Sequence, residues 1–137
     1  MCKLFHFDCE REVYRAGAFV LTCFDARIET PIRKFLRRRG AEPADVARIP
    51  GGARALAAPV REYERDFALA MLRTSIALHS PPRVMLVGHA DCGAYGGAGS
   101  HVVIADLKTA ARVVAEAEPS LPVELYFVEF DGVYGVE

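Results

Sequence analysis

Short apolar runs alternate with segments of helical periodicity along this chain, and that alternation constrains the fold more than any other feature. Residues 18–23 form a continuous apolar run, which is typical of a strand buried on both faces of a sheet. Strand–helix alternation of this kind predicts a mainly parallel sheet with right-handed crossovers. The other predicted elements are strands at 45–49, 83–88 and 123–130 and helices at 30–40, about 59–80 and 103–117.

These elements predict a three-layer α/β fold. Its sheet is mainly parallel, has about four strands in the order 2-1-3-4, and carries flanking helices on both faces. We expect residues 1–137 to form a single domain in which residues 1–17 are a short N-terminal extension. At the element ends, Thr30 is the expected N-cap of the first helix, Gly93–Gly99 an expected loop, and Asp131-Gly132 a turn into a short tail.

Composition excludes several classes of partner. The chain carries 17 basic and 18 acidic residues, a net charge of -1, so it has no general electrostatic reason to bind nucleic acid or an anionic membrane. No apolar run approaches the roughly 20 residues that a membrane span needs, and we expect a cytoplasmic protein. The four cysteines, at 2, 9, 23 and 92, are unevenly spaced, which in a reducing compartment favours metal or catalytic thiols over a disulfide framework.

Two strand ends carry residues that bind metals. Cys23 ends the first predicted strand, and His89 and Cys92 directly follow the third. In the predicted strand order these two ends are neighbours at the carboxyl edge of the sheet, where doubly wound folds bind their ligands. Thiolate and imidazole are the preferred zinc ligands, and three of them leave one position open. Spacing alone leaves two readings even: a metal site, or a satisfied histidine with two buried thiols.

Charged residues beside Cys23 favour the metal site. Asp25 and Arg27 follow the apolar strand at intervals of two, so in an extended segment they point the same way as Cys23. Charges at a strand end are costly unless they are paired, which predicts an Asp25–Arg27 ion pair.

These motifs together resemble the β-class carbonic anhydrases. The two zinc motifs of that family are Cys-x-Asp-x-Arg and His-x-x-Cys, and here they read Cys23-x-Asp25-x-Arg27 and His89-x-x-Cys92 in the same order. Arg48-Ile49-Pro50-Gly51-Gly52 is similar to the Arg-x-x-Gly-Gly segment between them. The resemblance covers roughly residues 18–130 and departs from the family in its short N-terminal region and its lack of tryptophan.

The resemblance implies a zinc enzyme that hydrates carbon dioxide to bicarbonate. Cys23, His89 and Cys92 would bind zinc, which lowers the pKa of a bound water to about 7 and so makes hydroxide available. Asp25 would orient that hydroxide, and Arg27 would keep Asp25 ionised. In some members of the family the aspartate is instead a fourth zinc ligand, so the same role is open to Asp25.

The remaining implications concern the pocket, the partners and the alternatives. Gly51 and Gly52 would allow close backbone approach to the site, and Arg48 is a candidate for the pocket or for a structural ion pair. The family implies a homodimer or a larger homo-oligomer. Two alternatives stay open: a carbon disulfide-type hydrolase on the same scaffold, and a zinc-binding regulatory module with weak or no activity.

Overall fold

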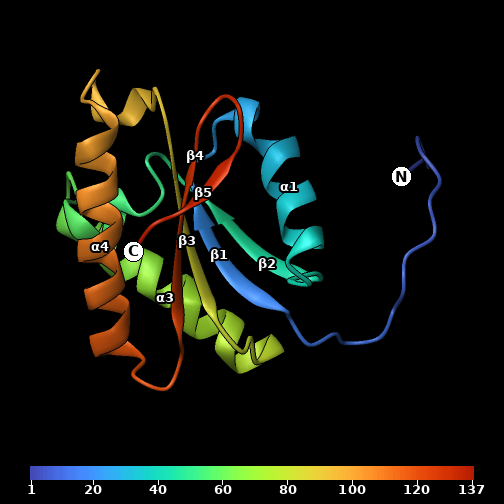
Figure 1. Cartoon of the computed structure of the whole chain (residues 1–137). Coiled ribbons are helices and arrows are strands. Elements are labelled where there is room, and N and C mark those ends of the chain that lie inside the picture. Colours follow the sequence, from blue (N-terminus) through green and yellow to red (C-terminus); the bar gives the residue numbers. More distant parts are fainter.

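The computed structural model describes residues 1–137 and contains one five-stranded sheet in the order β2-β1-β3-β4-β5 (Figure 1). The first four strands in this order are parallel to one another. Their order confirms the predicted 2-1-3-4. The fifth strand pairs antiparallel with β4. The strands are β1 (Ala18–Thr22), β2 (Ala44–Arg48), β3 (Val84–His89), β4 (Val123–Val128) and β5 (Val133–Gly135).

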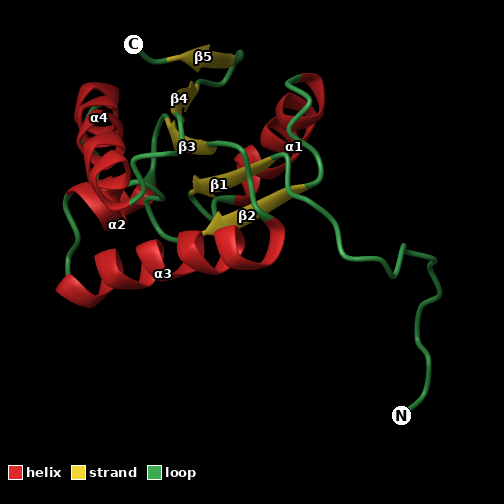
Figure 2. Ribbon diagram, turned by 90° about the horizontal axis from the view of Figure 1, so that it is seen from below, coloured by secondary structure: helices red, strands yellow, loops and turns green.

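Helices cover the two faces of the sheet unequally. Three of them, α2 (Arg54–Ala57), α3 (Glu62–His79) and α4 (Ser100–Ala117), lie on one face, whereas α1 (Glu29–Arg38) covers the other alone (Figure 2). The three-layer α/β architecture is therefore as predicted.

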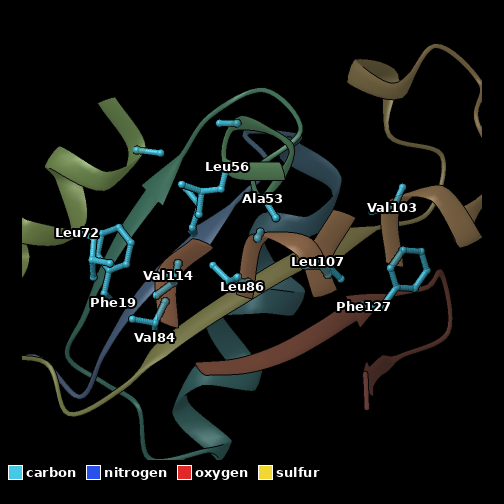
Figure 3. Packing of buried hydrophobic residues seen from close by; sticks show 14 residues of the cluster. Phe19, Ala53, Leu56, Leu72, Val84, Leu86, Val103, Leu107, Val114 and Phe127 are labelled. Atoms are coloured by element: carbon cyan, nitrogen blue, oxygen red, sulfur yellow. The ribbon is translucent and has the colours of Figure 1, made fainter. Parts of the chain in front are cut away.

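The strand β1 supplies side chains to both cores. Phe19 and Leu21 belong to the larger cluster, which packs against α2, α3 and α4, while Ala18 and Val20 belong to the cluster beneath α1. Figure 3 shows the larger cluster, in which Leu86 of β3 and Leu107 of α4 are fully buried. Burial on both faces explains why β1 has no polar alternation in its sequence.

Several elements differ from the sequence prediction. The tail after Asp131-Gly132 forms β5, because a hairpin closed by a hydrogen bond from Glu129 N to Gly132 O (2.9 Å) turns it back onto β4. Helix α4 begins at Ser100, three residues earlier than predicted, and Gly93–Tyr95 of the predicted loop forms a 3₁₀ turn.

The start of α1 differs for a reason that affects the site. The helix begins at Glu29, and Ile28 rather than Thr30 occupies the N-cap position. A 3₁₀ turn at Ala26–Ile28 leads straight into α1, and the side chain of Asp25 caps that turn by accepting a hydrogen bond from the Arg27 amide. The segment after Cys23 is thus curled, whereas we predicted it to be extended.

The N-terminal residues run outside the body of the molecule as an extended segment (Figure 1). This segment joins the body at Tyr14, whose hydroxyl donates to Asp45 on β2 and whose ring stacks on His79 at the end of α3. No helix in the chain combines the length and the apolar character that a membrane span requires.

Candidate metal centre

Two adjacent strands bring three buried metal-binding side chains together. Cys23 follows the last residue of β1, His89 is the last residue of β3, and Cys92 lies in the turn after it. Because β1 and β3 are parallel neighbours, their carboxyl ends meet at one edge of the sheet. The ligand atoms of the three residues lie within 4.8 Å of one another, and the residues are only 5%, 2% and 5% exposed.

The orientation of these groups fits a bound cation. The Nδ1 atom of His89 lies 2.8 Å from the carbonyl oxygen of Ala90, so Nδ1 carries the proton and donates it. Its Nε2 atom is buried, has no hydrogen-bond partner, and presents a lone pair to the thiols. The two sulfur atoms are 3.8 Å apart, and two thiolates bound at about 2.3 Å to a tetrahedral zinc ion would be separated by about 3.8 Å. The three residues can therefore hold a metal ion.

The two thiols have different acidities. Burial raises the pKa of Cys23, but contact with the His89 ring in its protonated form and with the backbone amides of Asp25 and Gly51 outweighs this effect and brings the pKa to about 7. Burial raises the pKa of Cys92 to about 11, and the neighbouring Cys23 contributes to that rise, although the amide of Ala94 opposes it. A cation between the two sulfurs would stabilise both thiolates at once.

Beside the thiols, Asp25 and Arg27 form the predicted ion pair. The Arg27 Nη2 and Asp25 Oδ2 atoms are 2.7 Å apart, and Arg27 Nε lies 3.1 Å from both carboxylate oxygens. Hydrogen bonds from the Arg27 side chain and amide lower the pKa of Asp25 to about 2, so the carboxylate is ionised at neutral pH. The carboxylate is not part of the three-ligand cluster, and its role as a fourth ligand stays a prediction.

Sequence reasoning missed a second acidic partner of Arg27. Asp91 accepts a hydrogen bond from Arg27 Nη1 at 2.9 Å through its side chain and one from Nη2 at 3.0 Å through its carbonyl oxygen. Asp91 has a φ of 52°, a left-handed conformation that is uncommon outside glycine. Its position between the ligands His89 and Cys92 is the one signal in the sequence that places it near the site.

The glycine pair packs against the end of β1. Gly52 has a φ of 54°, and a methyl group on it would lie 2.8 Å from the Thr22 carbonyl carbon and 3.0 Å from the Cys23 nitrogen. Glycine is therefore required where this turn packs against the end of β1. The Nη2 atom of Arg48 donates to the Asp25 carbonyl oxygen at 2.9 Å, and its Nη1 atom is 3.8 Å from a Glu29 carboxylate oxygen.

A cleft of about 560 Å³ opens beside the cluster. Its walls are mainly apolar, and the Asp25 carboxylate and the Cys23 thiol contribute to them. Phe24 supplies an aromatic side chain, in place of the tryptophan that the chain lacks. The lining residues are Cys23, Phe24, Asp25, Ala26, Pro50, Gly93 and Ala94.

Solved structures with the same fold are β-carbonic anhydrases. One of two tetrameric β-carbonic anhydrases from Sordaria macrospora aligns with a TM-score of 0.64 and 14% identity, over 90% of this chain and 81% of that one. β-Carbonic anhydrase isoform I from Trichomonas vaginalis aligns with a TM-score of 0.65 and 14% identity, over 96% and 87% of the two chains. The β-carbonic anhydrase CafA of Aspergillus fumigatus aligns with a TM-score of 0.58 and 16% identity, over 90% and 76%.

Comparisons at the level of sequence agree with this fold. No curated protein matches the chain. A family described as "Putative carbonic anhydrase" matches residues 15–136, which is nearly the whole chain. The chain therefore belongs to this carbonic anhydrase family, and the resemblance drawn from its two motifs is confirmed.

Proposed function

We propose that the chain is a zinc-dependent carbonic anhydrase, which interconverts carbon dioxide and bicarbonate. The observation that carries the proposal is the convergence of Cys23, His89 and Cys92, with the Nε2 lone pair of His89 unpartnered, beside a carboxylate on the wall of a cleft. Two thiolates and one imidazole are a zinc donor set that leaves one position for a water molecule.

When bound, zinc would lower the pKa of a coordinated water to about 7, so that a nucleophile is available near neutral pH. Asp25 accepts a hydrogen bond from the attacking water and so directs a lone pair of its oxygen toward the substrate. Arg27 holds the Asp25 carboxylate ionised and in place. The apolar walls formed by Phe24, Pro50 and Ala94 suit an uncharged, apolar substrate such as carbon dioxide.

The assembly and the location of the enzyme are part of the same proposal. The Sordaria macrospora enzymes are described as tetrameric, which supports a homodimer or larger homo-oligomer here. Cys2 and Cys9 are exposed free thiols, which suit the reducing environment of the cytoplasm.

The deciding experiment combines metal analysis with a rate measurement. We expect purified protein to contain about one zinc per chain and to accelerate carbon dioxide hydration in a stopped-flow assay. Cys92→Ser should lose the metal and the activity together, because a neutral hydroxyl is a poor replacement for a thiolate. Parallel assays with carbon disulfide test the alternative substrate.

Two results would contradict the proposal. Full zinc occupancy with no acceleration above buffer would identify a zinc-binding module without this activity. Hydrolysis of carbon disulfide in preference to hydration of carbon dioxide would assign the site to the related substrate.

A further inference from the structure

Arg54 connects two backbone segments that both contact the metal centre. It is the first residue of α2 and directly follows the glycine turn. Its Nη1 atom donates a hydrogen bond to the carbonyl oxygen of Ala94, two residues after the ligand Cys92. Its guanidinium carbon also lies 5.4 Å from the centre of the Tyr95 ring, in the same loop.

Each of the two segments lies next to one of the cysteines. In the glycine turn, a methyl group on Gly52 would lie 3.0 Å from the Cys23 nitrogen, and Ala94 follows Cys92 by two residues. The segments are in tight contact: a methyl group on Gly51 would lie 3.1 Å from Arg54 Cβ and 3.2 Å from Ala94 Cβ. Arg54 therefore lies where the glycine turn meets the loop after Cys92, and its side chain bonds to that loop.

The charge of Arg54 has no acidic partner. Its guanidinium forms no ion pair in the structure, although the residue is half-buried and its bond to Ala94 lies in a partly buried region. A charged donor makes a stronger hydrogen bond to a carbonyl than a neutral donor does, and partners beyond the direct ligands commonly fix the orientation and strength of metal ligands.

We propose that Arg54 is a positioning residue of the metal centre, which fixes the glycine turn against the loop after Cys92 and thereby the spacing of the Cys23 and Cys92 sulfurs. This inference rests on the proposed zinc site. Arg54 contacts neither the substrate cleft nor a ligand atom, so it acts through the backbone of the two segments.

Arg65 provides a matched control. Its Nε atom donates to the carbonyl oxygen of Leu56 in α2 at 2.8 Å. Like Arg54, it is therefore an arginine whose side chain bonds to a backbone carbonyl. That bond joins α3 to α2 and does not involve the loop after Cys92. Loss of either arginine removes a bond to a carbonyl, but only loss of Arg54 should alter the metal centre.

The test measures metal binding by Arg54→Met, Arg54→Lys and Arg65→Met. Competition with a chelator should show zinc affinity weakened about 10-fold or more in Arg54→Met, a common cost of losing such a partner. Arg54→Lys, which keeps the positive charge, should recover part of the loss, and Arg65→Met should keep the parent affinity. In cobalt-substituted protein the sulfur-to-metal absorption band should shift for Arg54→Met and stay in place for Arg65→Met.

A second measurement needs no metal. Hydrogen exchange followed by NMR on metal-free protein should show faster exchange of the Gly51 and Ala94 amides in Arg54→Met than in Arg65→Met. If the parent protein bound no zinc, the proposed function would fail while this comparison still decided the role of Arg54. Parent-like affinity and exchange in Arg54→Met, or equal losses in the two methionine variants, would overturn the inference.

Discussion

At the scale of single residues, the Asp25 carboxylate owes its low pKa mainly to one neighbour. Arg27 donates to it from the side chain and from the backbone, and Asp91 holds the free side of the same guanidinium. The pKa of Asp25, about 2, lies below the ordinary aspartate value. A carboxylate with such a pKa stays ionised across the pH range in which the proposed enzyme would work. It can therefore accept a hydrogen bond throughout that range.

Substitution of Asp25 by asparagine should separate metal binding from turnover. We expect Asp25→Asn to retain its zinc, because the three ligands are unchanged, and to lose about 100-fold or more in hydration rate, because the charged acceptor is gone. Elemental analysis and stopped-flow kinetics measure the two effects. The exposed Asp131→Asn is the control, and a parent-like rate for Asp25→Asn would show that this carboxylate has no part in the reaction.

At the scale of elements, the turn between β2 and α2 fixes the position of the first ligand. Gly51 and Gly52 both have left-handed φ values, 71° and 54°, and Gly52 packs directly against the backbone of Thr22 and Cys23. The glycine turn therefore packs closely against the end of β1. A side chain at Gly52 would force the turn and the strand end apart.

Replacement of Gly52 by alanine should disturb both stability and the metal site. A new methyl group would meet backbone atoms that cannot move aside, and we expect a loss of about 1–3 kcal/mol in the free energy of unfolding together with weaker zinc binding. Gly40→Ala is a matched control, since Gly40 has a φ of 61° but open space around its Cβ position. Equal losses of stability and metal affinity in both variants would assign the effect to the φ angle alone.

Sequence patterns predicted the longer strands and helices. They missed the shortest elements and the features that depend on individual side-chain contacts. The strand order followed from strand–helix alternation, and the meeting of Cys23, His89 and Cys92 followed from that order, because doubly wound sheets bring the carboxyl ends of neighbouring parallel strands to one edge. Helix α2 and strand β5 are only four and three residues long, too short for a periodicity to be visible. The contacts of Asp91 and Arg54 depend on loop geometry, which residue spacing does not encode.

At the scale of the whole molecule, large apolar side chains remain exposed along one edge of the sheet. Val46 on the edge strand β2 is 42% exposed, and Phe67 and Leu78 on α3 are 58% and 61% exposed. All three line one groove of the surface. Exposed apolar side chains that gather in one groove favour contact with another protein surface.

Self-association should therefore be measurable. We expect sedimentation at micromolar concentrations to give at least twice the 15.0 kDa mass of one chain. The midpoint of unfolding by urea should also rise with protein concentration, because association stabilises the folded form by mass action. A species of 15.0 kDa at every concentration, with an unfolding midpoint that stays constant, would contradict the expected homo-oligomer.

The placement of the candidate metal-binding residues at the ends of β1 and β3 has a consequence for how the molecule can vary. Both strands have a parallel neighbour on each side, whereas β2 and β5 form the rims of the sheet. If an edge strand frays, or changes during evolution, β1 and β3 remain paired with each other. The amino-acid sequence can therefore diverge at the edge strands while the two central strands keep the candidate metal-binding residues together.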